Sequence, residues 1–206
     1  MVQELLRKGY IKRDNILNAF RTVDRANFVP DKYKEMAYYD EPIPIGYKQT
    51  TSAPSMIAVM LHLLEPNENS KVLEIGTGCG YNACLLGALG KEVITIERIP
   101  ELKNFAMENM KHCPYRDKIK IILGDGSNGY QNNAPYDRIL VTCGAPDIPQ
   151  PILGQLKEGG IMVIPVGGTF FQELYVVEKK EKYIKKTVWG DVSFVPMIGK
   201  HGHRLA

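Results

Sequence analysis

The sequence predicts an α/β fold in which helices cover both faces of a doubly wound, mostly parallel β-sheet. Two observations carry this prediction: short apolar segments alternate with helix-length segments from residue 71 onward, and a glycine-rich run follows the first apolar segment. Alternation at these lengths is typical of right-handed crossovers between parallel strands. A near-continuous apolar run such as Ile139-Leu140-Val141 indicates a strand that is buried on both faces.

The individual elements follow from this alternation. We expect strands at residues 71–75, 93–97, 119–123 and 138–142, and helices at residues 81–89, 99–112 and 150–156. Three further apolar segments, at residues 161–166, 173–178 and 187–195, follow one another without an intervening helix. The sheet is therefore expected to end in antiparallel strands, because adjacent antiparallel strands need only a short turn between them.

The first 70 residues have a different pattern and are expected to form a helical extension. Asp14 is expected to cap a helix over residues 15–23, and a second helix is expected to begin at Pro54. Residues 38–51, which lie between them, are turn-rich. We expect one domain over residues 1–206, with an N-terminal helical and loop region (1–70) and an α/β core with the C-terminal strands (71–206).

Composition limits the class of protein. The net charge of +3 comes from interspersed acids and bases, and it gives no reason to expect a nucleic-acid or membrane partner. The lysine-rich residues 179–186 are expected at a solvated hairpin tip. No apolar run approaches the roughly 18 residues of a membrane span, and the N-terminus does not resemble a secretion signal, so a cytoplasmic protein is expected.

The four cysteines, Cys79, Cys84, Cys113 and Cys143, are scattered along the chain. They form no Cys-x-x-Cys pair and have no histidine at ligand spacing. The sequence therefore predicts neither a zinc site nor a disulfide framework.

A glycine-rich run, VLEIGTGCGY at residues 72–81, follows the first strand of the core. It places Gly76, Thr77, Gly78, Cys79 and Gly80 at the turn between that strand and the next helix. Ligands bind at such turns in open α/β sheets. The spacing is G-x-G-x-G, unlike the G-x-G-x-x-G of dinucleotide sites, and Glu74 precedes it. An acid beside a tight loop suits a cofactor with a cationic amine and no phosphate.

Two further acids follow the next two strands. Glu97 stands where a ribose diol would lie, and Asp125, followed by Gly126, is placed to accept a hydrogen bond from an exocyclic amine. Amine, ribose and adenine are the polar parts of S-adenosylmethionine. Each acid alone also fits a structural role, but their succession predicts this cofactor and the Rossmann-like fold of class I methyltransferases.

The segment after the fourth strand narrows the class of acceptor. Enzymes that methylate amino groups of nucleic acids carry Asn or Asp before Pro-Pro-aromatic there, whereas this chain has TCGAP at residues 142–146. Cys143 lacks the preceding proline of cytosine methyltransferases and is expected to be a small packed side chain. Asp125, Asp137 and Asp147 are too dispersed for a metal-binding cluster, so no metal is expected.

Residues 37–56, AYYDEPIPIGYKQTTSAPSM, are polar and turn-rich. Thr50, Thr51 and Ser52 immediately precede the helix that begins at Pro54. Hydroxyls and backbone N–H groups at a helix N-terminus suit an anion. The alternative interpretation, that Ser52 only caps the helix, stays open at this point.

This segment resembles the A-Y-x-D-x-P-x-x-I-G-x-x-Q-T-x-S-x-P signature of the protein-L-isoaspartate O-methyltransferases. The glycine run resembles that family's V-L-E-I-G-T-G-S-G-Y, and residues 136–167 resemble its region around strands four and five. The resemblance covers about residues 17–196. It implies methyl transfer to the free α-carboxylate of isoaspartyl residues in damaged proteins, after which the ester collapses to a succinimide that can reopen as aspartate.

The resemblance also implies roles for residues that match the family's motifs. Ser52 matches the active-site serine, and the expected substrate contacts are Gly46, Gln49, Thr50, Thr51 and Ser52. The expected cofactor contacts are Glu74, Gly76, Thr77, Gly78, Cys79, Gly80, Glu97, Asp125 and Gly126. Cys79, Thr51, Ser55 and the Cys143-Gly144 pair depart from the usual residues, but none of these departures removes a charge or hydroxyl with an assigned role.

The chemistry of the acceptor sets further expectations. An α-carboxylate with a pKa of about 3.3–3.7 is already ionised at neutral pH, so no general base and no catalytic histidine are expected. Neutral donors suit the charge dispersal in the transition state, so Lys48 is expected to point outward. The strand edge at residues 166–172 is expected to pair with an extended peptide.

Two other functions remain open on the sequence alone. One is a methyltransferase acting on an RNA base or a small carboxylic acid, and the other is a non-catalytic module that only binds the cofactor. For the leading interpretation we expect a monomer whose partners are isoaspartyl proteins and peptides. The tail at residues 200–204 has no assigned role and is expected to be disordered.

Overall fold

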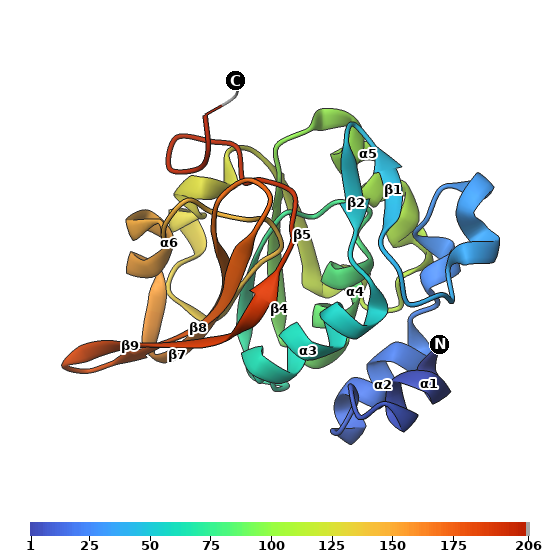
Figure 1. The fold of residues 1–206 in the computed structure, drawn as a ribbon, viewed down its shortest axis with the longest axis horizontal. Coiled ribbons are helices and arrows are strands. Elements are labelled where there is room, and N and C mark those ends of the chain that lie inside the picture. Colours follow the sequence, from blue (N-terminus) through green and yellow to red (C-terminus); the bar gives the residue numbers. More distant parts are fainter. Residues whose placement is uncertain (205–206) are drawn as a thin grey trace.

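The computed structural model describes residues 1–204, and its centre is a seven-stranded sheet with the order β5-β4-β3-β6-β7-β8-β9 (Figure 1). The strands are β3 (Lys71–Ile75), β4 (Glu92–Glu97), β5 (Ile119–Leu123), β6 (Tyr136–Val141), β7 (Leu156–Gly167), β8 (Gln172–Lys180) and β9 (Tyr183–Val192). Neighbours from β5 to β7 run parallel, and β7, β8 and β9 pair antiparallel. The predicted mostly parallel sheet with antiparallel C-terminal strands is confirmed.

Helices cover both faces of this sheet. The α-helices are α1 (Val2–Arg7), α2 (Asp14–Thr22), α3 (Pro54–Leu64), α4 (Tyr81–Leu89), α5 (Pro100–Asn109) and α6 (Gln150–Gly154). Short 3-10 turns are η1 (Arg25–Asn27), η2 (Asp31–Met36), η3 (Met110–His112), η4 (Arg116–Lys118), η5 (Gly126–Asn128) and η6 (Gln131–Asn133). Within the described residues, no helix is long and apolar enough to cross a membrane.

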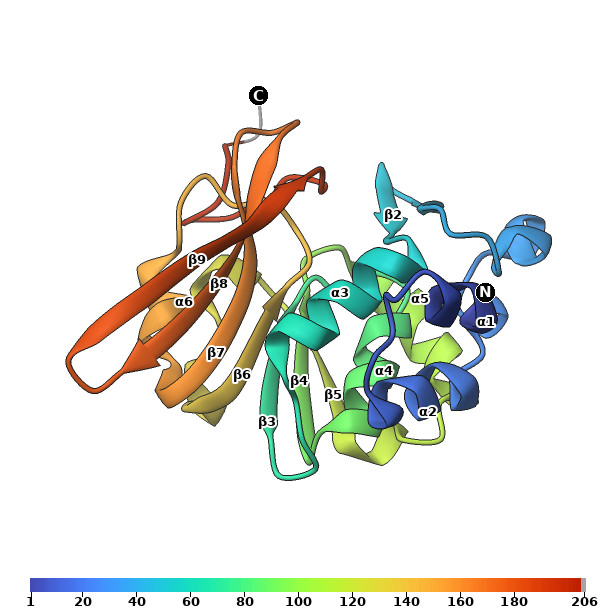
Figure 2. The ribbon, with the colours of Figure 1, turned by 60° about the horizontal axis from the view of Figure 1, so that its bottom comes forward.

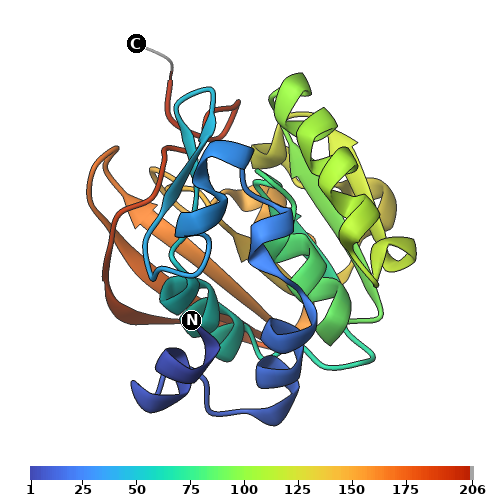
Figure 3. The ribbon, with the colours of Figure 1, turned by 90° about the vertical axis from the view of Figure 1, so that its right-hand side faces the viewer.

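The core is divided by the sheet because successive strand residues point to opposite faces. Val72 and Leu140 pack in a cluster with residues of α1 to α5, whereas their neighbours Leu73 and Ile139 pack in a second cluster with residues of α6. Figure 3 looks at the face on which the N-terminal segment (blue) lies beside α3 and α4. The near-continuous apolar strands predicted from the sequence are thus buried on both sides.

The N-terminal region differs in detail from the prediction. Helix α2 begins at Asp14 itself, Arg13 occupies the N-cap position, and its side chain makes no capping bond. The expected cap by Asp14 is therefore wrong; the Asn15 side chain instead accepts the N–H of Ile16. The segment expected to be turn-rich also contains a hairpin of β1 (Ile43–Gly46) and β2 (Gln49–Thr51).

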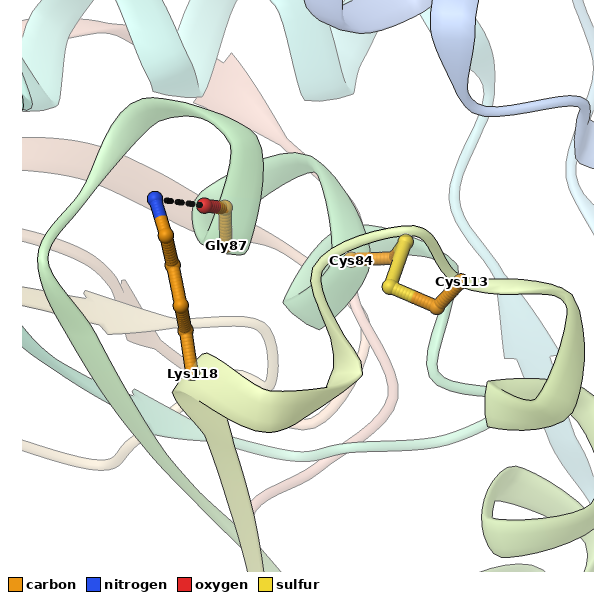
Figure 4. Close-up of a disulfide and its surroundings, with 4 residues drawn as sticks. All are labelled: Cys84, Gly87, Cys113 and Lys118. Carbon is orange, nitrogen blue, oxygen red and sulfur yellow. Dashed lines mark hydrogen bonds between the residues drawn. A yellow bond between two sulfur atoms is a disulfide. The ribbon is translucent and has the colours of Figure 1, made fainter.

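Two cysteines form a disulfide, which corrects the prediction of no disulfide framework. Cys84 in α4 is bonded to Cys113 after η3, with 29 residues of separation and Cα atoms 5.9 Å apart (Figure 4). Nearby, the Lys118 ammonium donates to the carbonyls of Gly87 and Gly90. A pairing set by the packing of α4 against the α5–β5 connection leaves no local sequence motif, so cysteine spacing could not show it.

The C-terminal tail is ordered as far as the structure describes it, so the expectation of disorder is wrong for residues 200–204. The backbone N–H of Lys200 donates to Asp125, and that of His201 donates to Ser127. The N–H of His203 donates to the carbonyl of Met197. These bonds hold the tail against the loop after β5.

Candidate active site

A cavity lies at the edge of the sheet where the parallel strands β3 to β6 end. The space between its walls is about 580 Å³, part of it open to solvent. Its walls come from the loops after β3, β4, β5 and β6, from the β1–β2 hairpin and from the C-terminal segment; they are Ile45, Gln49, Thr50, Ile75, Gly76, Gly78, Ile96, Glu97, Arg98, Ile99, Leu102, Gly126, Ser127, Thr142, Cys143, Val195, Pro196, Met197 and Ile198. The topology therefore brings together segments that are far apart in the chain.

The glycine loop is held tightly against the ends of the strands. The N–H groups of Gly76 and Thr77 both donate to the carbonyl of Ile96, at 2.9 and 3.2 Å. The Thr142 hydroxyl donates to the carbonyl of Gly76 at 2.9 Å. Gly76 has a φ of +98°, and a side chain there would overlap the Thr142 hydroxyl, so this position requires glycine.

Glu97 reaches the cavity from the end of β4. Its carboxylate accepts N–H groups from Gly78 at 2.9 Å and from Arg98 and Ile99 at 2.9 and 3.0 Å. A carboxylate has about four lone-pair sites, so one acceptor position remains for a ligand hydroxyl. Glu97 thus fixes the glycine loop and lines the cavity, and its contact with a ribose stays a prediction.

Glu74 is placed behind the glycine loop and is fully buried. Its oxygens accept the Thr95 hydroxyl at 2.6 Å and the Asn82 amide at 2.7 Å, and Thr95 in turn lies 2.7 Å from the Thr77 hydroxyl. Burial raises the pKa of Glu74 to about 7, although these hydrogen bonds oppose the shift. Over the described residues, the cavity walls include the loop that Glu74 supports and not Glu74 itself.

The carboxylate of Asp125 is largely occupied by hydrogen bonds from the protein's own groups. One carboxylate oxygen accepts the N–H and the hydroxyl of Ser127, at 2.9 and 2.7 Å, and the other accepts the N–H of Lys200 at 2.7 Å. Burial alone would raise the pKa of Asp125, but these hydrogen bonds outweigh it and the net direction is downward. Gly126 and Ser127, not Asp125, reach the cavity wall within residues 1–204. A direct contact of Asp125 with the cofactor stays a prediction.

Two further spaces adjoin this cavity on the side of the hydroxyl-rich segment. One lies between that segment and the glycine loop, and the other is a groove bounded by the start of α3 and by Ser193, Phe194 and Val195. Ser52 lines both. Thr50 and Thr142 line these two spaces and also the cavity at the strand ends. The three spaces therefore meet between Thr50 and Thr142.

Ser52 does not act as the cap of α3. The N-cap position is Ala53, without a side-chain capping bond, and the N–H of Ser55 is bound by the Asp40 carboxylate at 2.8 Å. The interpretation of Ser52 as a mere cap is therefore wrong. Ser52 instead lines both the space beside the glycine loop and the groove.

The other expected substrate residues separate into two groups. Thr51 is buried and lines the space beside the glycine loop, and Gln49 lines the cavity at the strand ends. Gly46 and Lys48 are exposed near the hairpin turn, so Lys48 does point outward as predicted. Gly46 shapes the turn with a φ of +94°, and a contact with substrate stays a prediction.

A buried arginine anchors the acceptor segment. Arg25 is fully buried, and its guanidinium donates to the carbonyls of Ala37, Tyr39, Glu41 and Ser52 at 3.0–3.3 Å. Burial lowers the pKa of Arg25, which remains a strong base. This single side chain ties both ends of residues 37–52 together. The sequence did not indicate this role of Arg25. Its acceptors are backbone carbonyls, which every residue has, so no acidic residue in the sequence marks them as its partners.

Two further parts of the site were missed. From the sequence, Thr142 served only as part of the evidence against a nucleic-acid methyltransferase. Its position after β6 nevertheless places it at the meeting point of the three spaces. The segment Val195–Ile198 lines the cavity because it bridges to Gly144: the N–H of Gly144 donates to Val195 and that of Met197 donates to Gly144. Thr142 could have been found from its place at a strand end, but the C-terminal segment carries no such signal.

Two sequence expectations have different outcomes in the structure. Cys143 is buried, and burial raises its pKa to about 12, so it carries a neutral thiol beside the cavity. The expected pairing of a peptide with the strand edge at residues 166–172 is wrong at Val166 and Gly167. Those residues already pair with β8 and with Ala145.

Comparison with known proteins places this geometry in a family. The family model for protein-L-isoaspartate (D-aspartate) O-methyltransferase matches residues 1–202. The chain belongs to this family. A protein-L-isoaspartate O-methyltransferase of Methanopyrus kandleri is 49% identical over 206 residues, covering 98% of this chain and 91% of the relative. One from Thermococcus sibiricus is 50% identical, covering 99% and 94%.

Solved structures agree with this assignment. A protein from Plasmodium falciparum, described as a putative protein-L-isoaspartate O-methyltransferase in complex with S-adenosyl-L-homocysteine, superposes with a TM-score of 0.82 at 30% identity, covering 96% of both chains. Another protein-L-isoaspartate O-methyltransferase superposes with a TM-score of 0.85 at 27% identity, covering 98% of this chain and 67% of the other. The predicted resemblance is confirmed, and with it the class I methyltransferase fold.

Proposed function

We propose that this chain transfers the methyl group of S-adenosylmethionine to the free α-carboxylate of L-isoaspartyl residues in damaged proteins and peptides. The observation that carries the proposal is the junction, between Thr50 and Thr142, of the cavity at the strand ends with a hydroxyl-lined groove. A methyl donor in the cavity and a carboxylate in the groove would meet there. Family membership over nearly the whole chain supports the same reaction.

The cavity suits the cofactor in shape and in polar groups. Gly76 and Gly78 leave space for close approach of a ligand to the backbone, and Glu97 offers an acceptor to a ribose diol. Ile96, Ile99 and Leu102 supply the apolar wall that an adenine ring needs. When bound, the cofactor supplies an electrophilic methyl group on a cationic sulfur.

The chain's own residues orient and shield the acceptor. Its carboxylate is ionised at neutral pH, so the hydroxyls of Thr50 and Ser52 need only donate to it and aim one oxygen at the methyl carbon, about 3–3.5 Å away. Neutral donors leave the carboxylate reactive, whereas an ion pair would stabilise the reactant more than the transition state. A peptide and a cofactor bound together would displace water from the groove, which would favour a reaction that disperses opposite charges.

Ser52 is proposed as the residue that orients the attacking oxygen. We expect Ser52→Ala to lower kcat by about 100-fold, the order found when one oriented donor is removed from an active site. Steady-state kinetics with an isoaspartyl peptide measure this, with Ser193→Ala, which lies in the groove wall, as the matched control. Turnover by Ser52→Ala equal to wild type would contradict the role.

The reaction is tested with two peptides that differ only in isoaspartate versus aspartate. Base-labile methyl label from S-adenosylmethionine is expected on the isoaspartyl peptide alone, because an ester of the α-carboxylate is lost in base. Label on neither peptide, with binding of S-adenosylhomocysteine shown by calorimetry, would leave a cofactor-binding module. Base-stable label on RNA would favour the alternative of a nucleic-acid enzyme.

We also propose that the enzyme is a cytoplasmic monomer without a nucleic-acid or membrane partner. The modest net charge of +3, made of interspersed acids and bases, supports the absence of an electrostatic partner. Light scattering during size-exclusion chromatography tests the oligomeric state. A mass of twice 23.2 kDa would contradict a monomer.

A further inference from the structure

The connection between β7 and β8 carries the two most exposed large apolar side chains of the described residues. Phe170 is 77% exposed and Phe171 is 82% exposed. An adjacent pair of solvated rings is unfavourable unless it serves a contact, and exposed aromatic residues are enriched at binding surfaces. We therefore expect this loop to contact a binding partner.

The loop stands at the same end of the molecule as the active site. Strand β7 runs parallel to β6, and Val166 near the end of β7 bridges to Ala145, three residues after Thr142. Residues 168–171 therefore leave the sheet at the edge where the glycine loop lies. Figure 2 shows the β7–β8 connection (orange) and the β1–β2 hairpin (cyan) rising from this end.

Hydrogen bonds connect the loop directly to the acceptor groove. The Ser193 hydroxyl donates to the carbonyl of Phe170 at 3.0 Å, and Ser193 and Phe194 line the groove together with Ser52. Buried Gln172 clamps the base of the loop by accepting the N–H of Phe194 at 2.8 Å and donating to the carbonyl of Gly168. The rings are thus presented on a fixed base beside the groove.

The segment that carries Ser52 supplies aromatic side chains as well. Tyr38, Tyr39 and Tyr47 are all exposed on residues 37–52. Exposed aromatic rings therefore occur on both chain segments, although the three tyrosines do not line the groove itself. Because the backbone of Val166 and Gly167 is already paired, an incoming polypeptide must be held here by side-chain contacts instead of strand addition.

We propose that Phe170 and Phe171 bind apolar side chains that flank the isoaspartate in an extended polypeptide, which rests on the proposed function. Folded proteins bury such side chains, whereas damaged or unfolded segments expose them together with the modified residue. A rim of this kind would direct the enzyme to unfolded substrates. This proposal narrows the substrate class from isoaspartyl carboxylates in general to isoaspartyl residues that have apolar neighbours in an extended polypeptide.

The test compares two isoaspartyl peptides, one with leucine and phenylalanine beside the isoaspartate and one with serine at those positions. Wild type is expected to show a KM about 10-fold lower for the apolar peptide, the effect of partly burying one ring. The double variant Phe170→Ser/Phe171→Ser is expected to abolish this ratio and to leave kcat with the serine peptide unchanged. Tyr183→Ser is the matched control, since Tyr183 is exposed at the opposite end of β8–β9.

The outcomes separate this proposal from the proposed function. Equal KM values for the two peptides with wild type, or an unchanged ratio in the double variant, would overturn the docking role and leave the reaction standing. Methylation of neither peptide by wild type would overturn the proposed function and the docking role together. An unchanged melting temperature of the double variant shows that the loss is not one of folding, as expected for two exposed side chains.

Discussion

The two halves of the active site are held in place by different means. The cofactor half is fixed by the sheet itself: the glycine loop is bound through Ile96 and Glu97, which belong to the neighbouring strand β4. The acceptor half, residues 37–52, lies outside the main sheet and is gathered by the single guanidinium of Arg25. Because of this difference, we expect a substitution in one half to change either cofactor binding or acceptor positioning, but not both.

The largest effect is expected from removing the anchor of the acceptor half. Arg25→Met leaves four carbonyls without their donor and should lower the free energy of unfolding by about 4 kcal/mol, since each unsatisfied buried group costs about 1–3 kcal/mol. Urea denaturation measures this loss. Arg138→Met is the control. Like Arg25, Arg138 donates to backbone carbonyls, in its case those of Glu65 and Asp137, but it is remote from the site.

The same variant probes the comparison directly. In folded Arg25→Met, the KM for an isoaspartyl peptide is expected to rise far more than the Kd of S-adenosylhomocysteine. A parallel loss of both affinities would mean that Arg25 supports the whole site, and the division into two halves would be wrong.

A somewhat smaller loss is expected from opening the disulfide, which reinforces the cofactor half. Cys84 lies in the helix that follows the glycine loop, and the bond closes a segment with 29 residues of separation. Chain-entropy arguments give about 3–4 kcal/mol for a loop of this length. The double variant Cys84→Ser/Cys113→Ser should show this loss of stability in thermal unfolding. A reductant should then lower the melting temperature of wild type and leave that of the double variant unchanged. Wild-type unfolding that is insensitive to reductant would contradict the prediction.

A change confined to the cofactor half should leave the acceptor half intact. Glu97→Gln weakens a charged acceptor and is expected to raise the Kd of S-adenosylhomocysteine by about 10- to 100-fold, as hydrogen bonds to charged groups contribute about 1.5–3 kcal/mol. Calorimetry measures this, with Glu92→Gln at the other end of β4 as the control. A comparable rise in the peptide KM would argue against separate halves.

Another effect expected in the cofactor half concerns the pH dependence of stability. Burial raises the pKa of Glu74 from 4.5 to about 7, so the folded state binds this proton more tightly than the unfolded state. Stability from this group is therefore full below about pH 4.5 and is lost as pH rises toward 7. Glu74→Gln, which mimics the protonated form, should gain stability relative to wild type by about 2–3 kcal/mol between pH 5 and pH 8, because one pKa unit corresponds to about 1.4 kcal/mol. Parallel curves for the two proteins in urea denaturation from pH 5 to 8 would contradict a protonated Glu74.

Much of the fold could be predicted because its causes are local. Apolar runs and helix-length spacings predicted strands β3 to β9, and the glycine run predicted the turn beside the cavity. The ends were less accurate: β7 begins at Leu156, where a helix was expected, because its first residues already pair with Tyr136. The single-domain organisation stays a prediction, which the packing of Phe20 and Phe28 against Tyr81 supports.

The site was only partly predictable because its remaining features depend on tertiary contacts. Glu74 and Asp125 were found as acids at strand ends, yet their hydrogen bonds are with Thr95, Asn82, Ser127 and Lys200. Arg25 and the Cys84–Cys113 bond join segments whose proximity no local pattern encodes. Sequence pattern thus indicates which chemistry is present, whereas packing decides which groups face the ligand.

One measurement tests the separation of the two halves most directly. S-adenosylhomocysteine is titrated calorimetrically into wild type and into Ser52→Ala, with turnover of an isoaspartyl peptide measured on the same preparations. We predict equal Kd values within about twofold, together with the roughly 100-fold loss of kcat. A Kd that rises in proportion to the loss of turnover would contradict the account, because Ser52 would then belong to the cofactor half.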